Sequence, residues 1–179
     1  HSWNCPMPGT SWYWRSAMTD LTGKVAVITG GAAGIGGGVS RRLAAAGAQL
    51  RVNDIDADLI ATLKQEVPDA RTVLGDITEQ STVDALAEAS ADGVDIVVNN
   101  VGDYRPSAPS FKRSTPEQWQ RLYELNLRHV FTVTHTLLPL MRSPGSLLNP
   151  PPPEPMRGIP THAANPPFHP SAARLHPSG

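Results

Sequence analysis

Aliphatic and polar residues alternate with two different periods between residues 21 and 141. Short runs rich in aliphatic residues predict four strands: Val25–Thr29, Gln49–Asn53, Arg71–Leu74 and Val94–Val98. Between them, apolar residues recur at helical spacing over 34–46, 57–66 and 79–91. Strands that alternate with helices predict a parallel sheet that is covered by helices on both faces.

A longer helix is predicted after the fourth strand. Thr115, Pro116 and Gln118 form the pattern of a helix N-terminus with a capping box. Apolar residues at helical spacing extend this helix to about Met141, and Pro139 is expected to bend or fray its end. Right-handed crossovers would bring the loops that follow the strands to one edge of the sheet.

The loop after the first strand is rich in glycine and is the strongest candidate site. Its sequence is Thr29-Gly30-Gly31-Ala32-Ala33-Gly34-Ile35-Gly36. Gly30 permits a tight turn, Gly34 lets the backbone approach a pyrophosphate, and Gly36 lets the next helix pack close to the strand. The N-terminus of that helix would offer N–H groups and positive partial charge to phosphates. Glycines also serve ordinary loops, so a purely structural interpretation stays open.

Acidic residues follow the next two strands, at the same predicted edge. Asp54 ends the second strand, where a carboxylate can accept hydrogen bonds from ribose hydroxyls and repels a 2′-phosphate, which favours NAD over NADP. The alternative is a turn or helix-cap aspartate, because further aspartates follow it. Asp76 and Ile77 follow the third strand, where an adenine would lie. An N-cap role for Asp76 is equally open.

Amide side chains mark the remaining candidate positions. Asn99-Asn100-Val101-Gly102 ends the fourth strand, where amides can tie neighbouring loops together and Gly102 leaves room for a ribose or nicotinamide. A simple turn is the alternative, since Asn and Gly are common turn formers. Asn126 lies within an amphipathic helix, where Asn is locally unfavourable; this indicates a functional role unless the side chain is merely exposed.

These five motifs, in this order over 21–141, resemble those of the short-chain dehydrogenase/reductase (SDR) family. The resemblance implies an α/β fold with a Rossmann-like, doubly wound parallel sheet, incomplete in this chain. It implies NAD as cofactor, with NADP less favoured, and a small alcohol or ketone as substrate. Asn126 would anchor a water molecule in a proton relay. The implied cofactor contacts are Gly30, Gly34, Ile35, Gly36, Asp54, Asp76, Ile77, Asn100, Val101 and Gly102.

The catalytic Ser, Tyr and Lys of that family are not found at the matching positions. Ser146–Asn149 resembles the family's fifth strand, and counting in register from it places the three catalytic positions at Pro152, Asn165 and His169. Asn165 cannot act as a phenolic acid or base, and His169 is a poor substitute for an ammonium group at neutral pH. By lineage the chain would transfer a hydride between NAD(H) and an alcohol or carbonyl substrate, with impaired catalysis. The alternative is a non-catalytic NAD-binding or interaction protein.

Proline sets the C-terminal part of the chain apart. Of the 18 prolines, 11 lie from Pro144 onward, and the run Pro150–Pro153 argues against a central strand because proline cannot donate to the ladder. We therefore expect a disordered extension over 1–17, a partial NAD-binding domain over 18–142 and a disordered tail over 143–179. A sheet of four strands would expose an edge and be marginally stable. Sequence error, a decayed gene copy and a true non-catalytic variant all explain such a tail.

Composition excludes some classes of binding partner and indicates the cellular compartment. The net charge of -1 argues against nucleic-acid or membrane-surface partners. No apolar run is long enough to span a membrane, no signal-peptide pattern begins the chain, and the single Cys5 fits a reducing compartment, so we expect a cytoplasmic protein. We expect no metal site. The family's usual homo-oligomer is in doubt, because the second helix through which members pair is missing or broken by proline.

Overall fold

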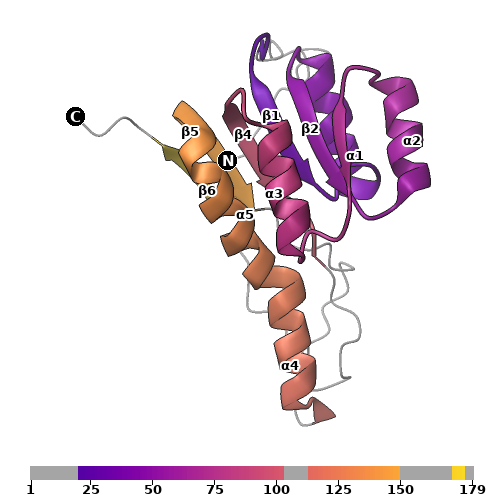
Figure 1. The fold of residues 1–179 in the computed structure, drawn as a ribbon, viewed down its shortest axis with the longest axis vertical. Helices are drawn as coiled ribbons and strands as arrows, with labels where there is room; N and C mark the ends of the chain where they lie inside the picture. The colour runs from indigo at the N-terminus through magenta and orange to yellow at the C-terminus, as the bar shows by residue number, and fades with distance from the viewer. Residues whose placement is uncertain (1–19, 103–112, 150–170, 176–179) are drawn as a thin grey trace, which may run out of the picture.

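Six strands form one sheet in the order β3-β2-β1-β4-β5-β6 (Figure 1). The computed structural model describes residues 20–102 and 113–149 and the backbone of 171–175. The first five strands are parallel, and β6 pairs with β5 in the antiparallel direction. The strands are β1 (Val25–Thr29), β2 (Gln49–Asp54), β3 (Arg71–Leu74), β4 (Val94–Asn99), β5 (Met141–Asn149) and β6 (Ser171–Leu175).

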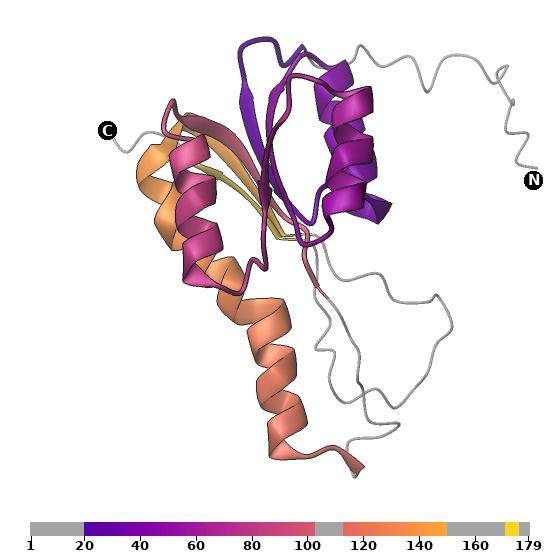
Figure 2. The ribbon, with the colours of Figure 1, turned by 45° about the vertical axis from the view of Figure 1, so that its right-hand side comes forward.

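Helices cover both faces of this sheet, as the sequence predicts. Figure 2 shows α1 and α2 on one face and α3 and α5 on the other. Alternate side chains of β1 point to opposite faces of the sheet. Ile28 belongs to the core under α1 and α2, and Val27 belongs to the core under α3 and α5. The helices are α1 (Gly34–Ala45), α2 (Ala57–Glu66), α3 (Gln80–Ala89), α4 (Pro116–Tyr123) and α5 (His129–Leu137).

The long helix predicted after β4 is present, but it is not a uniform α-helix. Its start is confirmed, since the Thr115 hydroxyl accepts from the Gln118 N–H at 3.4 Å and the Gln118 side chain accepts from the Thr115 N–H at 3.0 Å. Between α4 and α5 lies a π-helical turn, η2 (Glu124–Arg128). Its cause is local: the Asn126 amide donates to the carbonyl of Leu122 at 2.9 Å and so competes with the backbone ladder.

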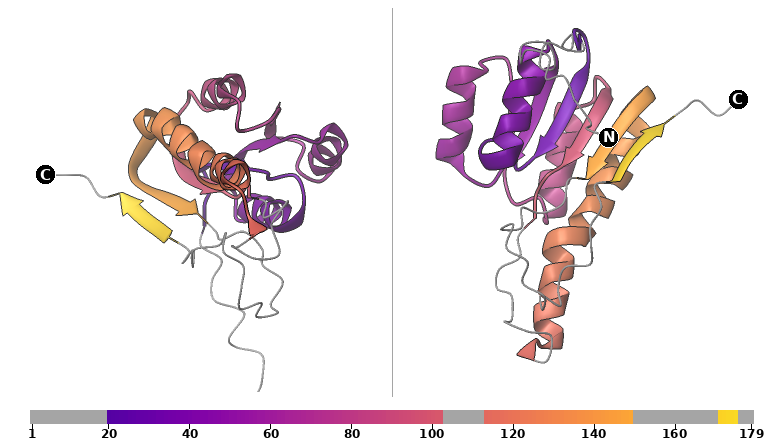
Figure 3. Two further views of the ribbon diagram at one scale, coloured as in Figure 1. Left: turned by 90° about the horizontal axis from the view of Figure 1, so that it is seen from below. Right: turned by 180° about the vertical axis from the view of Figure 1, so that it is seen from behind.

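The prediction that order ends near residue 142 is wrong for two segments. Met141–Asn149 forms β5, in which Leu147 and Leu148 pair with Val97 and Val98 of β4, and Ser171–Leu175 forms β6. The prolines do not prevent this, because Pro144 lies between Met141 and Ser146, where the pairing of β5 with β4 shifts register, and the run from Pro150 begins only after β5 ends. The expected four-strand sheet is therefore a six-strand sheet, with β6 along the outer side of β5 (Figure 3). The predicted extension over 1–17 lies outside the described residues, as do 150–170 of the tail.

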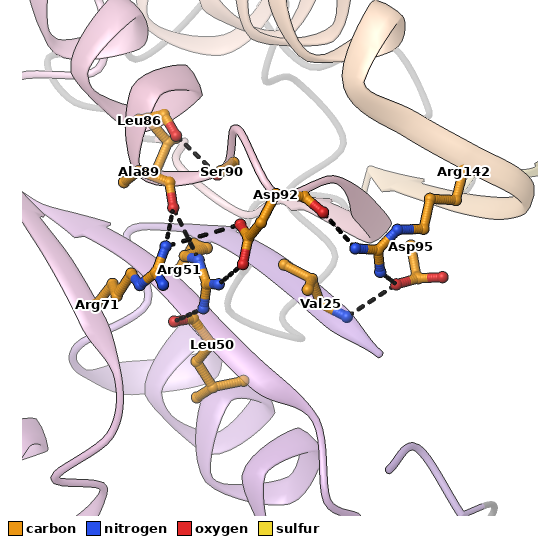
Figure 4. A network of polar contacts seen from close by, with 10 residues as sticks. All are labelled: Val25, Leu50, Arg51, Arg71, Leu86, Ala89, Ser90, Asp92, Asp95 and Arg142. Atoms are coloured by element: carbon orange, nitrogen blue, oxygen red, sulfur yellow. Dashed lines mark hydrogen bonds and ion pairs between the residues drawn. The ribbon is translucent and has the colours of Figure 1, made fainter. Parts of the chain in front are cut away.

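Buried charges lie near the amino ends of the strands (Figure 4). Arg51 of β2 is only 2% exposed, and its guanidinium donates to the carbonyl of Ala89 at 2.8 Å and to Asp92 at 2.7 Å. Asp95 of β4 is 4% exposed and accepts from the Val25 N–H and the Lys24 ammonium, both at 2.9 Å, and from Arg142 at 2.8 Å. These contacts fasten β1, β4 and the start of β5 together at the edge opposite the candidate site.

Replacing Asp95 by Asn should lower the free energy of unfolding by about 1–3 kcal/mol at neutral pH, because Lys24 and Arg142 lose their carboxylate. Burial opposes ionisation of Asp95, but the hydrogen bonds from Val25, Lys24 and Arg142 and the charge of Lys24 hold its pKa below the usual value. The carboxylate therefore stabilises the fold above the unfolded pKa of about 3.9, and that contribution disappears as pH falls through the folded value.

Urea unfolding measures this difference between pH 7 and pH 3. The gap between the wild type and Asp95→Asn should close on acidification, and the exposed Asp69→Asn serves as control. A constant gap over this range would show that the carboxylate charge contributes nothing.

Candidate functional site

The glycine-rich turn lies at the carboxyl end of β1 and leads into α1. Gly30 and Gly34 have φ of 58° and 56°, the left-handed region that favours glycine. At Gly36 an added Cβ would lie 2.1 Å from the carbonyl oxygen of Gly30 and 2.5 Å from the Asn100 amide nitrogen. At Gly34 an added Cβ would meet nothing within 4 Å. The helix thus packs against the turn at Gly36 and leaves open space at Gly34.

The loop after β4 is fastened directly to this turn. The Asn100 side chain donates to the carbonyl of Gly30 at 3.0 Å. The Thr29 hydroxyl accepts from the backbone N–H groups of Asn100 at 3.0 Å and Val101 at 3.3 Å. A Cβ on Gly30 would approach the Val101 side chain to 2.9 Å. The prediction that Asn amides tie neighbouring loops together is therefore confirmed for Asn100, and Gly102 follows in the same half-buried loop.

Asp54 lies against the glycine-rich turn at the end of β2. Its carboxylate accepts from the N–H of Ala32 at 3.0 Å and from that of Ile55 at 2.9 Å. Asp56, not Asp54, caps α2, since it accepts from the first backbone N–H groups of that helix. The helix-cap alternative for Asp54 is therefore wrong. The turn alternative is supported, because the same carboxylate also accepts from the Asp56 N–H at 3.3 Å, and the structure places this carboxylate next to the glycine-rich turn.

Asp76 and Ile77 have local structural roles in the connection from β3 to α3. Asp76 accepts from the N–H of Thr78 at 2.9 Å and from its hydroxyl at 2.8 Å, while Glu79 occupies the N-cap position of α3. The Ile77 side chain is 3% exposed and belongs to the core under α3 and α5. A ligand at this position could therefore meet the exposed Asp76 carboxylate, but only the backbone of Ile77.

Asn126 lies on the π-helical turn and is half-buried, so simple solvent exposure does not explain it. Its amide group is used at least in part to shape the turn through Leu122. Ile35, at the start of α1, is 53% exposed beside the glycine-rich turn. The predicted catalytic positions Pro152, Asn165 and His169 lie outside the described residues.

Three buried polar residues at this edge have roles that the sequence does not predict: Asn53 and His129 are not among the predicted site residues, and Asn99 is named only as part of the motif after the fourth strand. Asn53 donates to the carbonyl of Gly75 at 2.9 Å and so holds the loop after β3. Asn99 donates to Asn149 at 2.9 Å and joins β4 to β5. His129, at the start of α5, is 1% exposed. The position of the two asparagines in the sequence could have indicated them. Asn53 and Asn99 each lie at the end of a buried strand, and a polar residue at the end of such a strand indicates a specific hydrogen bond.

Two classes of feature are absent from the part of the chain that the structure describes. Residues 20–102 and 113–149 hold no group of histidine, cysteine and carboxylate side chains that could bind a metal ion. The helices within these ranges are all too short or too polar to cross a membrane.

Comparison with known proteins identifies the family to which this arrangement belongs. A family model described as short chain dehydrogenase matches residues 24–149. The chain belongs to the short-chain dehydrogenase family. L-fucose dehydrogenase of Oryctolagus cuniculus is 36% identical to it over 131 residues, which is 71% of this chain and 46% of that protein. The chain spans about half the length of the curated relatives it matches.

Solved structures of short-chain dehydrogenases share the fold. A 7α-hydroxysteroid dehydrogenase complexed with NADH and 7-oxo glycochenodeoxycholic acid is 35% identical, with a TM-score of 0.63 over 69% of this chain and 50% of that one. A blue fluorescent protein from a metagenomic library in complex with NADPH is 29% identical, with a TM-score of 0.66 over 73% of this chain and 56% of that one. Because neighbours hold either nucleotide, the family identity supports NAD(P) binding without choosing between the two.

Proposed function

We propose that this chain binds NAD(H) at the carboxyl edge of its sheet, with the dinucleotide phosphates at the glycine-rich turn. The observation that carries the proposal is the contrast within that turn. Gly36 is so tightly packed that a Cβ would collide with Gly30, whereas the position of Gly34 is open. The first turn of α1 also contains no acidic residue that would repel an anion from its N-terminus.

Asp54 supports NAD over NADP. Its carboxylate is fixed beside the turn through the N–H of Ala32, and a negative charge there would repel a 2′-phosphate. Asp76 and the loop Asn100–Gly102 line the same edge and would hold the adenine and the nicotinamide ribose. When bound, the nicotinamide supplies a carbon that accepts or donates hydride.

Replacing Asp54 by Asn should weaken NADH binding about tenfold and strengthen NADPH binding by a similar factor, because the amide keeps an acceptor for Ala32 but loses the charge. Titration of nucleotide fluorescence with both cofactors measures the two affinities. Asp58→Asn, which neutralises an exposed carboxylate in the first turn of α2, is the matched control. An unchanged ratio of the two affinities in Asp54→Asn would rule out the charge as the source of preference.

By lineage the reaction is hydride transfer between NAD(H) and a small alcohol or carbonyl substrate. We propose that this chain performs it poorly, since Pro152, Asn165 and His169 occupy the positions counted for the family's Ser, Tyr and Lys. A positioned acid or base contributes about 10²–10⁴-fold in rate, and Asn165 cannot supply one. Asn126, at the π-helical turn, would be the remaining member of the proton relay.

Two measurements on the same protein test the proposal. Calorimetry with NAD+ and NADH tests binding, and absorbance at the nicotinamide band in the presence of a panel of alcohols tests turnover. Binding with little or no alcohol-dependent reduction is the expected result. Alcohol-dependent reduction at rates ordinary for an enzyme would overturn the impairment, and absence of binding to either nucleotide would overturn the site.

The second candidate is a non-catalytic NAD-binding or interaction protein. It is favoured by the combination of a complete glycine-rich turn with substituted catalytic positions. NADH binding with no turnover on any substrate, in contrast to slow turnover on one of them, would favour this candidate over an impaired enzyme. We further propose a cytoplasmic location and action without a nucleic-acid partner, on the grounds of the single cysteine and the near-neutral charge.

A further inference from the structure

His129 is a histidine whose side chain is buried in the core beside the π-helical turn. It is the first residue of α5, directly after the π-helical turn, and it is 1% exposed. Neither Nδ1 nor Nε2 has a hydrogen-bond partner among the described residues. Buried polar groups are almost always paired, so an imidazole in this state calls for an explanation.

The polar groups that act on this ring come from the π-helical turn and from the candidate site. The backbone carbonyls of Glu124 and Val101 face the ring without reaching hydrogen-bond geometry, and the carboxylate of Asp76 acts on it from the β3–α3 connection. Burial lowers the pKa of His129, and the carbonyls of Glu124 and Val101 and the charge of Asp76 offset this only in part. The ring is therefore neutral at pH 7, with one donor nitrogen and one acceptor nitrogen.

Few other charges bear on this ring. On the π-helical turn, Glu124 and Arg128 form an ion pair with each other at 2.6 Å. The end of β4 and its loop, Asn99–Gly102, contain no titratable side chain. Asp76 is thus the one carboxylate from another element that acts on the ring among the described residues.

Val101 connects this ring to the glycine-rich turn. Its N–H donates to the Thr29 hydroxyl at 3.3 Å, and its side chain occupies the space that a Cβ on Gly30 would need. His129 therefore lies next to a residue, Val101, that also contacts the glycine-rich turn. A small movement of the segment Asn100–Gly102 would bring the Val101 carbonyl into line with the donor nitrogen.

We propose that neutral His129 is a positioning residue that holds the Val101 carbonyl when a nucleotide occupies the site, and that protonation of the ring weakens nucleotide binding. The inference rests on the proposed function. A protonated ring has two donors and no acceptor and carries a buried charge, so the Asn100–Gly102 segment must open to solvate it. Asp76 and the two carbonyls would reduce this cost without removing it.

The pH dependence of NAD+ affinity tests the inference. Calorimetry of the full chain from pH 8.0 to 5.0 should show the wild-type dissociation constant rising on acidification, by at most about tenfold per pH unit for one linked proton. His129→Asn, which keeps a donor but does not titrate, should bind nearly as well at pH 8.0 and lose this dependence. His135→Asn changes an exposed histidine on the same helix and should follow the wild type.

A second readout needs no nucleotide. The backbone amide resonances of Val101 and Gly102 should shift with the titration of the His129 ring in the wild type and stay constant in His129→Asn. Two results would overturn the inference and leave the proposed function intact. One is that the amide shifts of Val101 and Gly102 do not change as the ring titrates. The other is that His129→Asn keeps the wild-type pH dependence of binding. Failure of the wild type to bind NAD+ at every pH would instead overturn the proposed function and, with it, the binding role of His129.

Discussion

Replacing Gly36 by Ala should weaken NADH binding at least a hundredfold and lower the free energy of unfolding by about 2–4 kcal/mol. The added Cβ would lie 2.1 Å from the carbonyl oxygen of Gly30, a distance that no relaxation of a side chain can relieve because the obstacle is backbone. Either the N-terminus of α1 moves away from β1 or the turn itself opens. Both movements separate the N–H groups that are proposed to bind the phosphates.

Gly38→Ala is the matched control for this variant. Gly38 lies in the same helix two residues later, is exposed, and has nothing within 4 Å of an added Cβ. Because Ala favours helices, this control should raise the free energy of unfolding by about 0.5–1 kcal/mol and leave NADH binding unchanged. Urea unfolding and fluorescence titration separate the two effects. If Gly36→Ala and Gly38→Ala had nearly equal free energies of unfolding and NADH affinities, the close contact at Gly36 would be unimportant.

The sequence predicts the parallel part of this fold because each prediction there depends on neighbouring residues alone. The bounds of β1, α2 and β3 follow from local periodicity, and the structure reproduces them. The capping box at Thr115 is equally local. Gly36 shows the same rule for the site, since the need for a residue without Cβ follows from a strand, a tight turn and a helix in succession.

The features that sequence reasoning missed depend on partners distant in the chain. Nothing near Asn99 indicates that its amide meets Asn149, fifty positions away, because that contact exists only once β4 and β5 pair. His129 follows Arg128 in a helix with amphipathic spacing, and nothing in that spacing indicates that its side chain is buried near Val101. The π-helical turn similarly arises from an amide that competes with the ladder, which a helical period does not reveal.

The expectation of disorder over β5 is wrong for a different reason. The sequence itself contains evidence for a strand there, but the proline content of the segment outweighs it. Ser146–Asn149 resembles the family's fifth strand, whereas the many prolines from Pro144 onward favour disorder for the whole segment. Proline excludes a strand only where its missing N–H is needed, and the run from Pro150 lies beyond the last paired residue. The composition of a segment therefore says little about the four residues just before it.

Leu147→Asp should lower the free energy of unfolding by about 2–4 kcal/mol, whereas Leu148→Asp should lower it by less than half as much. The two residues are adjacent in β5 and point to opposite faces of the sheet. Leu147 packs against the core under α3 and α5, and Leu148 is 38% exposed. Only the first substitution therefore places a carboxylate against buried apolar side chains.

This pair of variants decides whether β5 belongs to the folded domain. Both change the same residue type to the same product, at positions one residue apart, so differences in helix or strand propensity and in net charge cancel. Thermal or urea unfolding of the full chain measures the gap between them. If the domain ended near residue 142, both variants would unfold like the wild type. A gap of the expected size and sign requires that β5 be paired with β4 and that its alternation of faces be as described.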